Sequence, residues 1–365
     1  MTATLELPGL FDGHVHLRWD ARTAIALPHT LRQFVAAVIM PNTAEKRIIR
    51  DVQDATDYEQ FLRDTASHHA QFSCNPVEGS KQRAESFKYL MTLYLTDETT
   101  PEDLEELHGH IVSIKVFLKG TTTGSGQGIS NLLAPHIITT LKKAADLGMP
   151  VSFHGEIPEG FPLDRVSKFL VILRQLLEII PNLKVIIEHL SSAEEIAFIK
   201  EMRQNGNVVY GTITLHHMLL TLEDLMGGGL NPHHHFFPCA KRPEDREAIR
   251  QAAFAAEPWC FFGSDSAPHF EANKLRVGGA GGVFSAPVLV PKLVAEFEAS
   301  DPVGWQGRLL CFARDNGRAV YKIDLPATPG LKLVKESWFV PSSYPGTSGA
   351  IVPFLAGQEI PWRIV

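Results

Sequence analysis

The chain has 365 residues, 44% of them hydrophobic, which is enough to bury a substantial core without disulfide bonds. Its formal net charge of −7 argues against nucleic acid or an anionic membrane as the main partner, but it allows an anionic substrate at a local site. No run of 18 uncharged apolar residues occurs, which excludes a membrane-spanning helix.

The four cysteines, Cys74, Cys239, Cys260 and Cys311, are scattered without a Cys-x-x-Cys pair, so we interpret them as free thiols. The first residues carry neither a basic segment nor a long apolar run, so no signal peptide is visible. We therefore expect a cytoplasmic protein.

Short apolar runs recur along the chain, and each is followed by a polar turn and a longer amphipathic stretch. Brief runs rich in Val, Ile, Phe and Leu are typical of parallel strands that are buried on both faces. We expect strands at residues 11–17, 36–40, 91–95, 113–117, 151–154, 184–189, 208–212 and 259–263.

The stretches between these runs carry helix signals. Apolar residues over 48–62 recur at roughly helical spacing. Thr100 and Pro101 are typical of a helix start, Ser192 and Glu195 have capping-box spacing, and Gly148 follows an apolar stretch as a stop.

Eight strands that alternate with helices predict an α/β fold, a (β/α)8 TIM barrel. A doubly wound sheet is less favoured because no Gly-x-Gly-x-x-Gly or P-loop follows the first strand. We expect residues 1–365 to form a single barrel domain with a C-terminal extension.

Metal-binding and polar side chains stand at the ends of the predicted strands, where barrel enzymes carry their catalytic groups. His14 and His16 are two residues apart, so on a strand they face the same side, as does Arg18. Such a pair alone could be a core feature. Together with His154, His189 and Asp265 at equivalent strand ends, it favours a metal centre.

Lys115 lies within an otherwise apolar strand, where an unpaired ammonium group is costly. From the residues alone two interpretations stay open. The lysine could pair with a nearby acid, or its neutral amine could add carbon dioxide to form an anionic carbamate that bridges two metal ions.

Seven motifs occur along the chain: residues 12–18 (DGHVHLR), 38–42 (VIMPN), 91–97 (MTLYLTD), 151–156 (VSFHGE), 185–189 (VIIEH), 263–269 (GSDSAPH) and 352–357 (VPFLAG). They resemble motifs of the amidohydrolase superfamily and, within it, of the shorter dihydroorotases. These segments occur in family order from near one end of the chain to near the other.

The resemblance implies a metal-dependent amidohydrolase with two zinc ions per subunit, although the same ligands would also accept cobalt or manganese. His14, His16 and Asp265 would hold one ion, His154 and His189 the other, and carboxylated Lys115 would bridge them. The homodimeric state is implied in the same way.

The implied reaction is the reversible cyclisation of N-carbamoyl-L-aspartate to L-dihydroorotate in pyrimidine biosynthesis, with a small molecule as partner. The metals would activate the attacking water, and Asp265 would take its proton and return it to the departing nitrogen.

The resemblance also assigns the groups that would bind the substrate. Arg18, Asn42 and His269 would fix the α-carboxylate, and backbone groups near Phe237 and Gly281 would contact the ring amide.

The glycine-rich stretch 120–128 has the composition of a mobile loop. By resemblance Thr122 and Thr123 would bond the substrate when this loop closes, and a merely flexible loop is the alternative. We interpret the tract His233–His235 as a histidine-rich loop rather than a metal site.

Two other functions remain open. Hydantoinases, dihydropyrimidinases and allantoinases are related, but they carry a small β domain that flanks the barrel. A first strand near residue 10 leaves no room for the N-terminal half of such a domain. A non-catalytic homologue would typically lack some ligands, whereas this chain has all those named.

Overall fold

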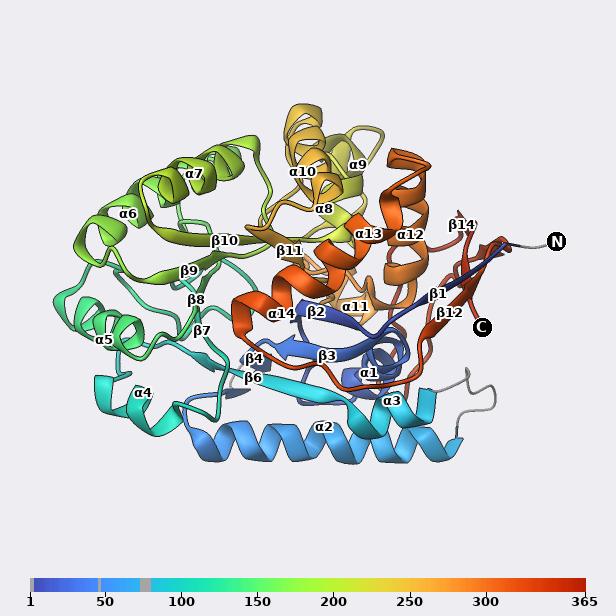
Figure 1. Cartoon of the computed structure of the whole chain (residues 1–365), viewed down its shortest axis with the longest axis horizontal. Coiled ribbons are helices and arrows are strands. Elements are labelled where there is room, and N and C mark those ends of the chain that lie inside the picture. The colour runs from blue at the N-terminus through green and yellow to red at the C-terminus, as the bar shows by residue number, and fades with distance from the viewer. Residues whose placement is uncertain (1–2, 45–46, 73–79) are drawn as a thin grey trace.

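An eight-stranded parallel sheet forms the centre of the computed structural model, which describes residues 3–44, 47–72 and 80–365 (Figure 1). Its strands run in the order β11-β10-β9-β8-β7-β6-β3-β2. They are β2 (Leu10–Val15), β3 (Phe34–Ile39), β6 (Lys88–Tyr94), β7 (Ser113–Val116), β8 (Val151–Phe153), β9 (Lys184–Ile187), β10 (Val208–Ile213) and β11 (Cys260–Phe262). All eight predicted strands are confirmed, with bounds that differ by a few residues.

The sheet curves until its two edges meet. Asp265, just after β11, donates its backbone N–H to the carbonyl oxygen of His14 at 2.8 Å, and His16 donates to Ser266 at 3.1 Å. Gly13 lies at this seam, where a Cβ atom would stand 2.6 Å from the Phe261 ring, so only glycine fits. The expected (β/α)8 barrel is thereby confirmed.

Helices follow the strands and cover the outside of the sheet (Figure 1). They are α1 (Arg22–Gln33), α2 (Val52–Phe72), α3 (Ser80–Ser86), α4 (Pro101–Leu107), α5 (Pro135–Asp146), α6 (Arg165–Ile179), α7 (Ala193–Gln204), α8 (Leu215–Leu219), α9 (Leu222–Met226), α10 (Pro243–Ala255), α11 (Glu271–Leu275), α12 (Leu289–Ser300), α13 (Trp305–Leu310) and α14 (Asn316–Tyr321). No helix in the described part of the chain is long and apolar enough to cross a membrane.

The helix signals read from the sequence are found at the expected places. Thr100 caps α4 in a capping box with Asp103, and the Ser192 hydroxyl accepts a hydrogen bond from the Glu195 backbone N–H at the start of α7. The carboxylate of Glu195 accepts instead from the backbone of Ser191. Gly148 adopts a φ of +66° just after α5, in the left-handed region that favours glycine.

The hydrophobic core has two parts, one between the sheet and the helices and one inside the barrel. It leaves one end of the barrel to polar side chains. Most apolar residues pack between the sheet and the outer helices. Inside the barrel, Phe11, Phe261 and Tyr321 form edge-to-face ring contacts at about 6 Å, so the end of α14 plugs the bottom. The opposite end, at the carboxyl ends of the strands, holds the polar residues described below.

A small antiparallel sheet joins the two ends of the chain. β1 (Thr4–Leu7) pairs with β12 (Leu331–Val334), which pairs with β15 (Arg363–Ile364). The residues before the first barrel strand, which we expected to leave no room for the N-terminal half of a flanking β domain, form one four-residue strand, β1, whose pairing with β12 the sequence did not predict. Two-stranded pairs are also formed by β4 (Asn42–Ala44) with β5 (Arg47–Ile48) and by β13 (Trp338–Phe339) with β14 (Glu359–Ile360).

Candidate metal centre and active site

Five strands bring metal-binding side chains to the same end of the barrel. His14 belongs to β2 and Lys115 to β7, while His154, His189 and Asp265 lie within three residues after the ends of β8, β9 and β11. Because the carboxyl ends of all barrel strands meet on one face, residues far apart in the sequence converge there.

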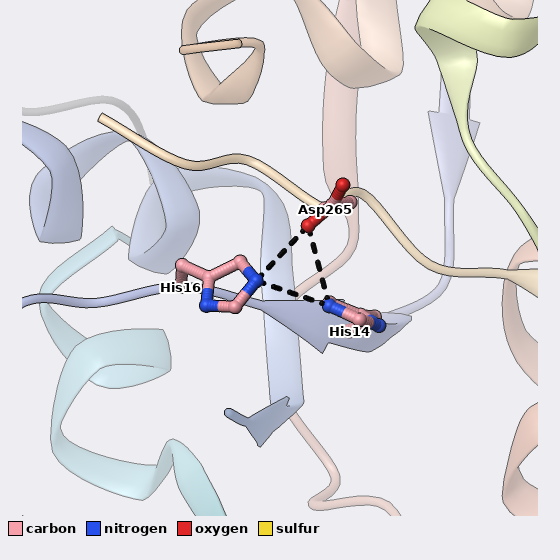
Figure 2. A group of neighbouring side chains, drawn as sticks. All are labelled: His14, His16 and Asp265. Carbon is pink, nitrogen blue, oxygen red and sulfur yellow. Dashed lines mark hydrogen bonds and ion pairs between the residues drawn. The ribbon is translucent and has the colours of Figure 1, made fainter. Parts of the chain in front are cut away.

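The first group consists of His14, His16 and Asp265 (Figure 2). The two Nε2 atoms lie 3.3 Å apart, and Oδ1 of Asp265 lies 3.3 Å from that of His14 and 3.1 Å from that of His16. A tetrahedral zinc ion with bonds of about 2.0–2.1 Å holds its ligand atoms about 3.3–3.4 Å apart. The spacing of these donor atoms therefore suits one such ion.

The second group lies beside the first. Nδ1 of His154 and Nε2 of His189 face each other at 3.1 Å, and the other nitrogen of His154 is 3.1 Å from a carboxylate oxygen of Glu156. The rings of His14 and His189 are 5.4 Å apart between centroids, so the two groups share one space.

Lys115 is fully buried at this centre, as the sequence suggested. Within the described residues its Nζ atom has no hydrogen-bond partner, and the ring of Phe117 is centred 5.2 Å away. Burial lowers the pKa of Lys115 to about 8, although the charges of Glu188 and Asp265 oppose this. A lowered pKa provides the neutral amine that addition of carbon dioxide requires.

Two of the candidate ligands have strained backbones. His189 and Asp265 adopt φ angles of +43° and +42°, in the left-handed region that side chains other than glycine rarely occupy. Such conformations persist where the surrounding structure imposes them, and they are frequent at functional sites. At Asp265 the seam with β2 imposes the turn.

Glu188 is a functional candidate that the sequence reasoning missed. Its Oε2 atom accepts hydrogen bonds from His14 Nδ1 at 2.9 Å and from the Thr212 hydroxyl at 2.6 Å. Burial alone would raise the pKa of Glu188, but His14, Lys115 and these hydrogen bonds lower it to about 2. The sequence did contain one signal of its role: Glu188 is a charged residue within the apolar run 184–189.

The residues expected to bind substrate line the space around the metal ligands. Arg18, Asn42, Thr122, Thr123, Phe237 and Gly281 share one cavity with both histidine groups. His269 lines an adjoining cavity together with Arg18 and Asn42. Among the described residues, Arg18 Nε, Asn42 Oδ1 and His269 Nε2 are buried without a hydrogen-bond partner, so these polar groups are available to a ligand.

The glycine-rich loop 120–128 contacts this cavity. Thr123 accepts a hydrogen bond on its hydroxyl from the Gly281 backbone N–H at 3.2 Å, and its carbonyl oxygen lies 3.4 Å from Asn42 Nδ2. The Tyr94 hydroxyl donates to the Gly124 carbonyl at 3.0 Å. Gly124 adopts a φ of +81°, which explains a glycine at this turn.

Other polar clusters stay outside the centre. Nδ1 of His234 lies 2.9 Å from the Asp224 carbonyl oxygen and 3.2 Å from Nδ2 of Asn231, and no metal-binding group among the described residues includes the tract His233–His235. Cys239, Cys260 and Cys311 are free thiols, as expected. Cys74 lies outside the described residues.

Comparison with known proteins yields close matches over the whole chain, although no family model matches it. A dihydroorotase of Helicobacter hepaticus is 34% identical over 367 residues, which cover 100% of this chain and 98% of that protein. A crystal structure of dihydroorotase from Campylobacter jejuni superposes with a TM-score of 0.86 at 32% identity, covering 100% and 98% of the two chains. The Saccharomyces cerevisiae dihydroorotase in complex with 5-fluoroorotic acid has a TM-score of 0.85 at 27% identity, covering 99% and 98%.

Proposed function

Since the chain belongs to the dihydroorotase family, we propose that it interconverts N-carbamoyl-L-aspartate and L-dihydroorotate in pyrimidine biosynthesis. The observation that carries the proposal is the convergence of two histidine groups, Asp265 and the unpartnered Lys115 in one buried space. The Saccharomyces relative holds a ring compound that bears a carboxylate, which supports a substrate of this chemistry.

The residues present fit two zinc ions. His14, His16 and Asp265 would hold one, His154 and His189 the other, and Lys115 would bridge them after its neutral amine adds carbon dioxide and loses a proton. The orphaned Nζ atom of Lys115 supports this, since a carbamate in its place would have partners. When bound, the metals lower the pKa of water and polarise the amide carbonyl.

Asp265 would move the proton. In hydrolysis its carboxylate takes a proton from the attacking water and delivers it to the ring nitrogen as the carbon–nitrogen bond breaks. In cyclisation the same carboxylate removes the proton from the attacking nitrogen and helps water to leave. Burial alone would raise the pKa of Asp265, but the neighbouring His14 and His16 hold the pKa of this carboxyl well below its usual range, so it is ionised and able to accept a proton.

Arg18, Asn42 and His269 would hold the substrate α-carboxylate. A guanidinium group matches carboxylate geometry with two parallel bonds, and Arg18 is only 4% exposed. A neutral ring such as dihydrouracil would leave this buried cation unpaired, which disfavours the hydantoinase type of substrate. The backbones of Phe237 and Gly281 would contact the ring amide, and Thr122 and Thr123 would bond the substrate from the closed loop.

Further parts of the proposal rest on the family resemblance and on the composition of the chain. We expect a homodimer in the cytoplasm that has no nucleic-acid or membrane partner, and a single catalytic barrel over residues 1–365.

A hydrolysis assay tests the proposal. Dihydroorotate turnover should disappear on complete chelation and return with zinc, while dihydrouracil and hydantoin stay unreacted. Asp265→Asn should lower kcat by about 100- to 10,000-fold. Asp146→Asn, an exposed residue at the end of α5, is the control and should retain full activity. Full turnover after removal of all metal, or a fully active Asp265→Asn protein, would refute the mechanism.

A further inference from the structure

A second cavity opens next to the metal centre, and its wall is positively charged. It shares Arg18, Asn42 and Thr123 with the inner cavity, so the two adjoin. Three guanidinium groups, those of Arg18, Arg22 and Arg276, line it against a single carboxylate, that of Asp20. We call this second cavity the vestibule.

Arg22 is fixed at the inner side of the vestibule. Its Nε and Nη2 atoms bond the Asp20 carboxylate at 2.9 and 2.5 Å, and its Nη1 atom lies 3.5 Å from Nδ1 of His269. Burial and then the charges of Arg18 and Arg22 hold the pKa of His269 well below its usual value. His269 is therefore neutral, and the excess of charge in the vestibule comes from the arginines.

Arg276 stands at the outer side, exposed just after α11. It forms no ion pair with any residue in the described ranges, so its charge is uncompensated. Because Asp20 is paired with Arg22, the guanidinium groups of Arg18 and Arg276 can attract an anion. The local charge of the vestibule is positive, whereas the net charge of the whole chain is −7. The vestibule therefore attracts anions.

We propose that the vestibule is an encounter site for dicarboxylates, with Arg276 as its main attracting group. This inference rests on the proposed function. At neutral pH N-carbamoyl-L-aspartate carries two ionised carboxylates and dihydroorotate carries one. The vestibule therefore draws in the substrate of cyclisation more strongly than the substrate of hydrolysis, before Arg18 takes one carboxylate and the other reaches the metal centre.

The size of the difference follows from the charges. The Coulomb energy of an encounter is proportional to the charge of the ligand, so a change that lowers capture of the dianion about tenfold lowers capture of the monoanion about threefold. Screening shortens the reach of the field from about 30 Å at 0.01 M salt to about 8 Å at 0.15 M.

The test compares Arg276→Gln with Lys142→Gln, which removes the same charge from an exposed site on α5. At about 0.01 M salt, R276Q should lower kcat/KM for N-carbamoyl-L-aspartate about 5- to 10-fold and for dihydroorotate about 2- to 3-fold. The kcat should stay unchanged in both directions, and the losses should vanish above about 0.3 M salt. K142Q should behave as the wild type.

Three outcomes would overturn the inference: equal losses for the two substrates, losses that persist at high salt, or no loss in R276Q. They are distinguishable from failure of the proposed function. If the zinc-loaded wild type turned over neither compound, the proposed function and the vestibule would both fall.

Discussion

At the scale of single residues, Glu188 lies against His14 and orients its ring in the candidate metal centre. Its carboxylate lies 2.9 Å from Nδ1 of His14 and favours the tautomer with the proton there, which leaves the lone pair on Nε2, the nitrogen that faces His16 and Asp265. Carboxylates that orient a ligating histidine in this way raise its basicity and fix its tautomer.

Replacing Glu188 by glutamine should therefore weaken metal binding about 10- to 100-fold, because the amide stabilises the required tautomer less well. The measurement is a competition with a chelator followed by metal analysis. Glu106→Gln, on the exposed face of α4, is the matched control. Equal metal retention in the two variants would show that Glu188 only supports the fold.

A second prediction for a single residue concerns the carbamate on Lys115. If the lysine carries a carbamate, protein loaded with carbon-13 bicarbonate and metal should show a carbamate resonance in its carbon-13 spectrum. Lys115→Ala should abolish the signal, and Lys142→Ala should keep it, since Lys142 is an ordinary exposed amine. A wild-type spectrum without the resonance would contradict the bridging role.

At the scale of elements, the loop 120–128 is held over the cavity by few bonds. The Tyr94 hydroxyl at the end of β6 reaches the Gly124 carbonyl, and the other anchors are the Thr123 contacts with Asn42 and Gly281. Losing one of them shifts the balance between closed and open loop.

Tyr94→Phe should raise KM for dihydroorotate about fivefold with a smaller effect on kcat, because one hydrogen bond is worth about 1 kcal/mol. Tyr89→Phe is the matched control: it lies on the same strand, and its buried hydroxyl has no hydrogen-bond partner among the described residues. Identical KM values for the two variants would mean that Tyr94 does not hold the loop.

The sequence predicted the barrel well, because each buried strand is a compact apolar run and several of the strands carry or precede a distinctive polar residue. It failed for β1, since four alternating residues form a strand only when β12, from the far end of the chain, pairs with them. Glu188 was missed for a similar reason. Its partner His14 lies 174 positions away, so the contact exists only in three dimensions.

At the scale of the whole molecule, the sheet of β1, β12 and β15 holds the two ends of the chain together at one side of the barrel (Figure 1). Leu333 is fully buried in this sheet, while its neighbour Lys332 is exposed. The sheet lies apart from the residues that line the metal cavity.

Leu333→Ala should lower the free energy of unfolding by about 2–5 kcal/mol, since it leaves a cavity, and should leave kcat unchanged. Lys332→Ala should change stability by less than about 0.5 kcal/mol. Chemical denaturation and the hydrolysis assay measure the two effects. A loss of kcat in L333A under conditions where the protein is folded would show that the small sheet also supports the site.

The seam between His14 and Asp265 has a consequence for how the protein is made. The first two candidate ligands, His14 and His16, leave the ribosome early, but Asp265 and the residues that close the barrel follow some 250 positions later. No nascent chain shorter than 265 residues holds all three members of this group, so the candidate metal-binding group is complete only after nearly three quarters of the chain has been made. Until then His14 and His16 stand without their third partner.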